Sequence, residues 1–230
     1  MNAELVVDAR DGVGESPVWS VAEQALYWVD IPGRKLQRWQ AGNGLVEHWG
    51  LPEQGGCIAA RSQGGWLCAM ESGVFQLEPG PQGALQTRRV ASIDHACDGM
   101  RFNDGRCDRQ GRLRAGTMLA DMAQALPAGA LYSLEPGGVL RALVKGLIVP
   151  NGLAFSPDGR TMYLSDSHPT VQAIWAFDYD TGTGTPSNRR LFVDMTPLAG
   201  RPDGAAVDAD GCYWICGNDA GLVHRFTPDG

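Results

Sequence analysis

The most constraining feature of the chain is a segment that occurs twice in nearly the same form. VPNGLAFSPDGRTMYLSD spans residues 149–166, and RPDGAAVDADGCYWICGN spans residues 201–218. With Asn151 and Asp203 placed at the same position, both copies continue with glycine, with Asp-Gly seven residues on, and with a polar residue fifteen residues on that closes a strand. A repeat of this kind is one supersecondary unit that buries its apolar face against the next unit, so it limits the fold more strongly than local propensity does.

The same spacing identifies three further copies. One begins at Glu15 and closes fifteen residues later at Asp30, and weaker copies begin near Gly56 and Asp104. The five starts are separated by 41, 48, 47 and 52 residues, which is typical of propellers with four strands per blade. Each copy has an apolar strand, a turn such as SPDG and a second apolar strand, the pattern of a hairpin. We therefore expect an all-β propeller, with residues 118–126 (MLADMAQAL) as a loop containing one helical turn.

The repeat length leads to an expected number of blades. Six units of this size require about 280 residues, whereas 27 residues follow the fifth start. The expectation is a single domain over residues 1–230, a six-bladed β-propeller truncated in blades five to six, with an incomplete C-terminal blade. The apolar segment ELVVDA, residues 4–9, is expected to close the ring by pairing with the last blade. Exposed sheet edges favour association, so a monomer or a weak dimer is expected.

Charge and cysteine placement exclude several classes of function. The net charge of −7 argues against nucleic acid and anionic membranes as partners, because both need a concentrated basic face. No basic stretch precedes an apolar one at the N-terminus, and no segment reaches the roughly eighteen apolar residues of a membrane helix. A cytoplasmic chain is therefore expected. Its six cysteines are scattered, so free thiols are expected rather than disulfides.

The repeat also predicts a site at the centre of the ring. The innermost strands of a propeller line its channel, so Glu15, Asn151 and Asp203 are expected to meet although they lie far apart in sequence. Two carboxylates and an amide in a partly dry channel repel one another unless a cation joins them. Oxygen ligands suit calcium, magnesium or manganese, whereas zinc accepts carboxylates but prefers nitrogen or sulfur.

A structural interpretation of these three residues competes with the metal site. Asn and Asp before Gly commonly form turns, and this explains Asn151 or Asp203 alone. Glu15 is a poor turn former, and its place in the same frame favours one divalent cation.

Several motifs carry a resemblance to a known family. They are GESPVW (14–19), RFNDGRCDRQGR (101–112), AGTM (115–118), GALYSL (129–134), NGLAFSPDGRTMYLSD (151–166) and PDGAAVDADG (202–211). In this order the chain resembles the gluconolactonase, regucalcin and senescence-marker family of six-bladed propellers, which includes sugar lactone lactonases. The resemblance implies a soluble small-molecule enzyme of carbohydrate metabolism.

The resemblance also implies roles for individual residues. It implies that Glu15, Asn151 and Asp203 hold one divalent cation and that Arg101 and Asn103 hold the sugar lactone. Asp121, just after AGTM, is the candidate for contacting substrate hydroxyls. One departure is Arg114, where the family has an aromatic residue, and its side chain is expected to reach solvent or a blade interface.

These residues suggest a hydrolytic mechanism. A cation polarises the lactone carbonyl, Asp203 acts as general base on water, and Arg101 and Asn103 orient the substrate. The expected activity is metal-dependent hydrolysis of an aldonolactone to the aldonic acid. The alternatives are a hydrolase of another ester or an organophosphate on the same scaffold, and a non-catalytic propeller that binds a divalent metal.

Overall fold

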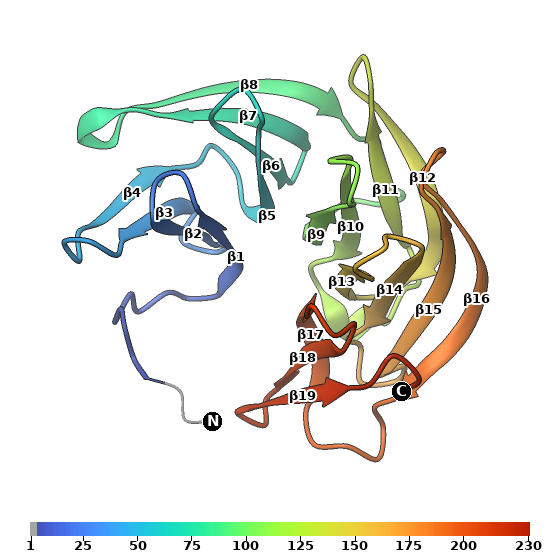
Figure 1. Ribbon diagram of the computed structural model, residues 1–230. Helices are drawn as coiled ribbons and strands as arrows, with labels where there is room; N and C mark the ends of the chain where they lie inside the picture. The colour runs from blue at the N-terminus through green and yellow to red at the C-terminus, as the bar shows by residue number, and fades with distance from the viewer. Residues whose placement is uncertain (1–3) are drawn as a thin grey trace.

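The computed structural model describes residues 4–230, which form antiparallel sheets arranged around a common centre (Figure 1). Each sheet is called a blade, numbered in chain order. Blade 1 contains β1 (Gly14–Ser20), β2 (Ala25–Asp30), β3 (Lys35–Gln40) and β4 (Val46–Gly50). Blade 2 contains β5 (Gly55–Ala60), β6 (Trp66–Met70), β7 (Gly73–Pro79) and β8 (Leu85–Ser92), with the short 3-10 turn η1 (Pro81–Gly83) between β7 and β8.

The remaining strands continue the same up-and-down order. Blade 3 contains β9 (Met100–Cys107), β10 (Leu113–Leu119), β11 (Gly129–Glu135) and β12 (Val139–Leu147). Blade 4 contains β13 (Pro150–Phe155), β14 (Thr161–Asp166), β15 (Ala173–Asp180) and β16 (Thr185–Asp194), and blade 5 contains β17 (Arg201–Val207), β18 (Tyr213–Asn218) and β19 (Leu222–Phe226). A single 3-10 turn, η2 (Met122–Gln124), follows β10 and confirms the expected helical turn there.

The number of blades corrects the sequence-based expectation. The propeller has five blades, so the prediction of a six-bladed ring truncated in blades five to six is wrong. The five repeat starts lie one in each innermost strand, β1, β5, β9, β13 and β17 (Figure 1). The repeats locate the five blades correctly. The expectation of a sixth blade rests on the usual size of propellers and not on a sixth repeat in this chain, and for this reason the count is wrong.

The expected closing strand is also absent from the structure. Residues 4–11 form no strand, and the side chains of Leu5 and Val6 are largely exposed. The alternating pattern of ELVVDA therefore does not lead to pairing with blade 5.

All five innermost strands share a register irregularity near the repeat start. Two residues of the inner strand oppose one of its neighbour in β1 after Glu15, in β9 after Phe102, in β13 after Asn151 and in β17 after Pro202, and β5 has an irregularity at Gly56. A bulge of this kind bends a strand and redirects its side chains, and it leaves backbone groups without ladder partners. The repeat start is therefore the place where each blade can present a polar side chain.

Apolar side chains fill the spaces between neighbouring blades. Tyr27 of blade 1 packs against Trp66 of blade 2 with ring centroids 4.3 Å apart, and Tyr163 of blade 4 packs against Tyr213 of blade 5 at 5.0 Å. All six cysteines are free, and Cys57, Cys68 and Cys212 are buried, which confirms the expected thiols. This packing fixes neighbouring inner strands relative to one another.

Arg114 lies at a blade interface and not in solvent. Its side chain is fully buried, donates from Nε to the Tyr179 hydroxyl at 3.0 Å, and contacts the hydroxyl of Ser133. Its Nη2 lies 3.3 Å from the carboxylate of Asp108, which also accepts a 2.7 Å hydrogen bond from Tyr179. We call Asp108, Arg114 and Tyr179 the interface triad, because they join blade 3 to blade 4 where an aromatic side chain was expected.

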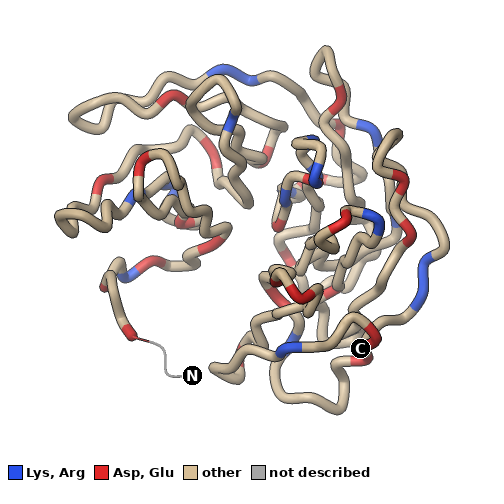
Figure 2. The backbone as a smooth tube through the Cα atoms, viewed as in Figure 1, with Lys and Arg blue, Asp and Glu red and all other residues tan. Residues whose placement is uncertain are grey.

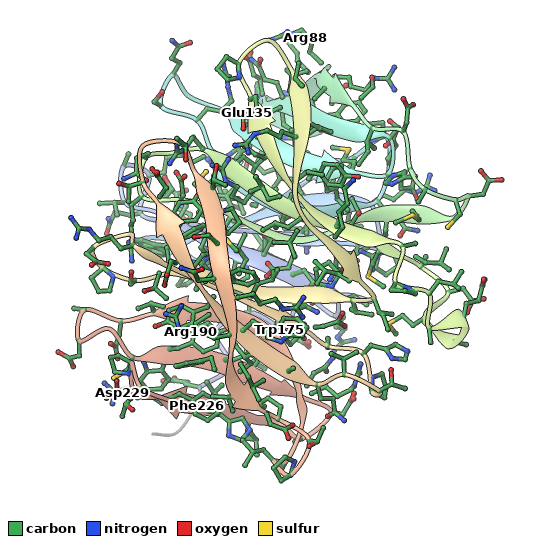
Figure 3. The ribbon with its side chains drawn as sticks, turned by 90° about the vertical axis from the view of Figure 1, so that its right-hand side faces the viewer. Arg88, Glu135, Trp175, Arg190, Phe226 and Asp229 are labelled. Carbon is green, nitrogen blue, oxygen red and sulfur yellow. The ribbon has the colours of Figure 1, made fainter. Side chains whose placement is uncertain are left out.

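Charged residues are distributed over all blades without one continuous basic stretch (Figure 2). Arg190 and Arg88 lie on the outer strands β16 and β8, far along the surface from one another (Figure 3). In the part of the chain that the structure describes, no helix is long and apolar enough to cross a membrane.

Candidate functional site

The predicted cation ligands lie on the innermost strands of three different blades. Glu15 lies on β1, Asn151 on β13 and Asp203 on β17, each at the bulge of its strand. Burial and the charges of Asp203 and Asp104 together raise the pKa of Glu15 from 4.5 to about 7. The Glu15 carboxyl of blade 1 is therefore buried in the electrostatic field of carboxylates from blades 3 and 5.

Asp203 experiences the same environment. Burial raises its pKa most strongly, the charge of Asp104 adds to the effect, and the guanidinium of Arg201 opposes it. Burial also raises the pKa of Asp104 itself, even though backbone amides and Arg106 favour its ionised form. Burial thus outweighs the neighbouring arginines at Asp104 and at Asp203 and favours the uncharged form of both carboxyls.

The predicted substrate-binding residues form a chain that leads to Asn151. Nη1 of Arg101 donates to Oδ1 of Asn103 at 2.8 Å, and Nδ2 of Asn103 lies 3.4 Å from Oδ1 of Asn151. Nδ2 of Asn103 also donates to the carbonyl of Pro150 at 3.0 Å. Asn103 thus links blade 3 to blade 4. Its side-chain oxygen accepts a hydrogen bond from Arg101, and its side-chain nitrogen has partners in blade 4.

Arg101 supplies a cation at this point. Its other hydrogen bond goes to the carbonyl of Phe102, so among residues 4–230 its guanidinium is bonded to neutral oxygens. Burial lowers its pKa, while the charges of Glu15 and Glu71 oppose that effect. A half-buried guanidinium without a carboxylate bonded to it can donate hydrogen bonds to an oxygen atom of a ligand.

Asp121 is not joined to the other predicted residues. It precedes η2, and its exposed carboxylate accepts hydrogen bonds from the amide of Ala123 at 3.3 Å and from Gln124 Nε2 at 3.0 Å. The loop that carries Asp121 begins at the end of blade 3 where Arg101 lies, since Met118 of β10 pairs with Arg101 of β9. In the described chain the carboxylate is thus engaged in capping its own turn.

Asp104 is a further acidic residue here that the sequence-based prediction does not include. The repeat places it at the start of the third copy, whereas the resemblance implies roles only for Arg101 and Asn103 of the same RFND motif. The structure shows that Asp104 Oδ2 accepts a 3.0 Å hydrogen bond from the amide of Leu153 in blade 4. The coincidence of an acidic residue with a repeat start was a signal that could have identified it.

The donor set fits a divalent cation. Glu15, Asn151 and Asp203 offer two carboxylates and one amide oxygen, and Asp104 adds negative charge beside them. No three His, Cys, Asp or Glu side chains within residues 4–230 are arranged to hold a metal by themselves. The candidate set contains only two residues of those types, so it depends on the amide of Asn151 as third donor. Hard cations such as calcium bind oxygen donors of these kinds.

A surface groove elsewhere contains none of the predicted site residues. It measures about 600 Å³ and lies between blades 1 and 2, against Tyr27, Arg38, Trp49 and Trp66. It includes the turns after β1 and β5, whereas Glu15 lies at the start of β1. The groove is therefore at the opposite end of the blades from the candidate site.

Comparison with known proteins agrees with the motifs. Residues 13–230 match the family described as SMP-30/Gluconolactonase/LRE-like region. A 6-deoxy-6-sulfogluconolactonase of Pseudomonas putida is 39% identical, with 100% of this chain and 77% of that protein aligned. Regucalcin of Danio rerio is 35% identical, with 99% of this chain and 75% of that protein aligned.

A solved structure supports the same relationship. Regucalcin of Agrobacterium tumefaciens, described as a calcium-binding protein, superposes with a TM-score of 0.86 at 30% identity, covering 96% of this chain and 72% of that one. The chain belongs to the SMP-30/gluconolactonase/LRE-like family.

Proposed function

We propose that the chain hydrolyses a sugar lactone to the corresponding aldonic acid and that one divalent cation assists the reaction. The observation that carries the proposal is the placement of Glu15, Asn151 and Asp203 at the bulges of three innermost strands, with the Glu15 carboxyl buried in the field of Asp203 and Asp104. The names of the relatives support the substrate class, because one is a sulfogluconolactonase. The calcium-binding neighbour supports a divalent cation without identifying the metal.

Glu15, Asn151 and Asp203 would hold the cation. Bound there, the cation would supply positive charge that polarises the lactone carbonyl and lowers the pKa of a water molecule. The burial of several carboxylates near one another has a physical reason under this proposal, because a divalent cation offsets their mutual repulsion.

The other side chains act on the substrate and on water. Asp203 takes a proton from the attacking water while the new bond to the carbonyl carbon forms. The bond from that carbon to the ring oxygen then breaks, and the ring oxygen receives the proton to give the hydroxyl of the acid. Arg101, held by Asn103, places a donor toward the substrate oxygens and fixes the lactone for attack.

The experiment measures acid release from a panel of aldonolactones that includes a 6-sulfo sugar lactone. The chain is treated with a chelator and then resupplied with calcium, magnesium, manganese or zinc in separate reactions. Hydrolysis that returns with a cation supports the proposal and ranks the sugars. Esters and organophosphates in the same panel test the alternative substrates, and cation binding without turnover by folded protein would favour a non-catalytic propeller.

A further inference from the structure

The geometry around Asn151 depends on an interruption in its strand. In β13, Asn151 pairs with Ser165 and the next pair is Ala154 with Tyr163, so Gly152 and Leu153 oppose a single residue. The amide of Leu153 is thereby free of the ladder with β14. A redirected backbone of this kind keeps one geometry only where other groups bond to it.

Two neighbouring blades supply those bonds. From blade 3, Asn103 donates to the carbonyl of Pro150 at 3.0 Å and Asp104 accepts from the amide of Leu153 at 3.0 Å. From blade 5, the Tyr213 hydroxyl donates to the carbonyl of Gly152 at 2.6 Å. The backbone on both sides of Asn151 is therefore bonded to side chains from other blades.

The carboxylate of Asp104 bridges two bulges. Its Oδ1 accepts from the amide of Gly105 in its own strand at 2.8 Å, while Oδ2 accepts from Leu153 in blade 4. Since both oxygens are occupied by backbone amides, the geometry favours an indirect role over one as a cation ligand.

Gly152 leaves little space for the bulge to rearrange. Its φ is +61°, and an added Cβ would lie 2.5 Å from the Tyr213 hydroxyl and 2.7 Å from the Ser165 hydroxyl. Only glycine adopts this conformation readily at such close approach. Gly152, the Asp104 carboxylate and the Tyr213 hydroxyl together hold the bulge of β13 in one conformation.

We propose that the Asp104 carboxylate and the Tyr213 hydroxyl are positioning groups that hold the bulge of β13 and thereby aim the Asn151 carboxamide at the cation. This inference rests on the proposed function, which makes Asn151 a ligand. It gives the two groups a role in cation affinity and in the orientation of Asn151, in addition to a role in the stability of the blades. Groups that orient metal ligands typically change affinity or activity by about 10- to 100-fold when removed.

The test compares calcium affinity with stability in the full chain. Tyr213→Phe removes one hydroxyl and keeps the buried ring, and Asp104→Asn keeps the size of the side chain but replaces one acceptor with a donor. Tyr179→Phe is the matched control, because Tyr179 is a similarly buried tyrosine whose hydroxyl bonds within the interface triad. Calcium titration calorimetry, thermal melting in chelator, and kcat and KM are measured for each.

The expected result separates the two kinds of residue. Tyr213→Phe and Asp104→Asn bind calcium about 10-fold or more weakly, and raising calcium restores part of their lost kcat. Tyr179→Phe melts at a lower temperature but binds calcium as the unaltered chain does.

Two other results overturn the inference in different ways. If both variants bind calcium with unaltered affinity and only melt earlier, the two groups are structural and the proposed function stands. If the unaltered, folded chain binds none of calcium, magnesium, manganese or zinc, the cation-dependent function fails and this inference fails with it.

Discussion

Two aspartates four residues apart in blade 3 lie in opposite environments. Burial raises the pKa of Asp104 on the innermost strand of the blade, and the charge of Asp104 in turn raises the pKa of Glu15 and of Asp203. At Asp108 burial also raises the pKa, but the amide of Arg112 and the side chains of Tyr179, Arg112 and Arg114 outweigh it, so its pKa lies below the ordinary value.

The difference distinguishes a structural site from one prepared for a ligand. The carboxylate of Asp108 has its counter-ions inside the protein, and the interface triad is complete as it stands. The carboxylates at the centre repel one another, and the guanidinium of Arg101 offsets only part of that repulsion at Glu15. Burial with incomplete charge compensation is typical of functional carboxylates, whereas a buried carboxylate with bonded counter-ions is typical of a structural ion pair.

The largest effect is expected from removing the proposed base at the centre. Asp203→Asn should lower kcat for the preferred lactone by about 10²- to 10⁴-fold, the usual contribution of a general base. Steady-state kinetics at saturating cation measure it, with circular dichroism to confirm folding. Full turnover in this variant would remove Asp203 from the mechanism.

A change in the interface triad should affect stability and leave chemistry intact. Asp108→Asn removes the charge that the buried Arg114 contacts, and breaking a buried pair typically costs about 3–5 kcal/mol of unfolding free energy. Urea denaturation measures the loss. The comparison breaks down if the folded variant instead loses cation affinity while its stability is unchanged.

The two regions should also differ in their response to pH. Because the pKa of Glu15 is raised from 4.5 to about 7, the folded chain retains a proton that the unfolded chain releases between these values. Its contribution to stability is therefore present below pH 4.5 and is lost as the pH rises to about 7. For Asp108, with its lowered pKa, the contribution is present above the ordinary value of 3.8 and is lost as the pH falls through the folded-state pKa.

Melting temperatures in chelator between pH 4.5 and 8 test the contribution of Glu15. The unaltered chain should lose more stability across this range than Glu15→Gln does, because the amide does not titrate. Parallel curves for the two proteins would show that neither burial nor the neighbouring charges raise the pKa of Glu15 in the folded chain.

The smallest effect is expected at the outer surface. Arg190 of β16 forms an exposed ion pair with Asp178 at 2.8 Å, and exposed pairs contribute little to stability because solvent screens them. Arg190→Ala should leave kcat and calcium affinity unchanged and shift the urea midpoint only slightly. A loss of activity here would contradict the assignment of the chemistry to the centre of the ring.

Much of this arrangement could be predicted from the sequence, because the repeat fixes which residues begin each inner strand. The repeat locates the starts at Glu15, Asn151 and Asp203 in this way, and the structure places each of them at the bulge of an innermost strand. The blade count could not be obtained from the same pattern, since it was extrapolated to residues without a repeat. The segment at residues 4–9 has a strand-like pattern, but pairing depends on a partner edge that local sequence does not describe.

Contacts between blades were the least predictable part of the site. The bonds of Asp104 to Leu153 and of Tyr213 to Gly152 join residues 49 and 61 positions apart, and no local pattern encodes them. Arg114 likewise had two expected locations, and only packing against Tyr179 selects the blade interface. Asp121 had a plausible place in sequence, but its carboxylate caps its own turn.

Calcium titration of the chelator-treated chain, with Glu15→Gln in parallel, tests the central claim most directly. The account predicts one calcium bound per chain, with binding strongly weakened in the variant because one of the two carboxylate ligands is lost. Absence of binding by the folded, unaltered chain, or equal affinity in the variant, would contradict the assignment of a cation to the centre of the ring.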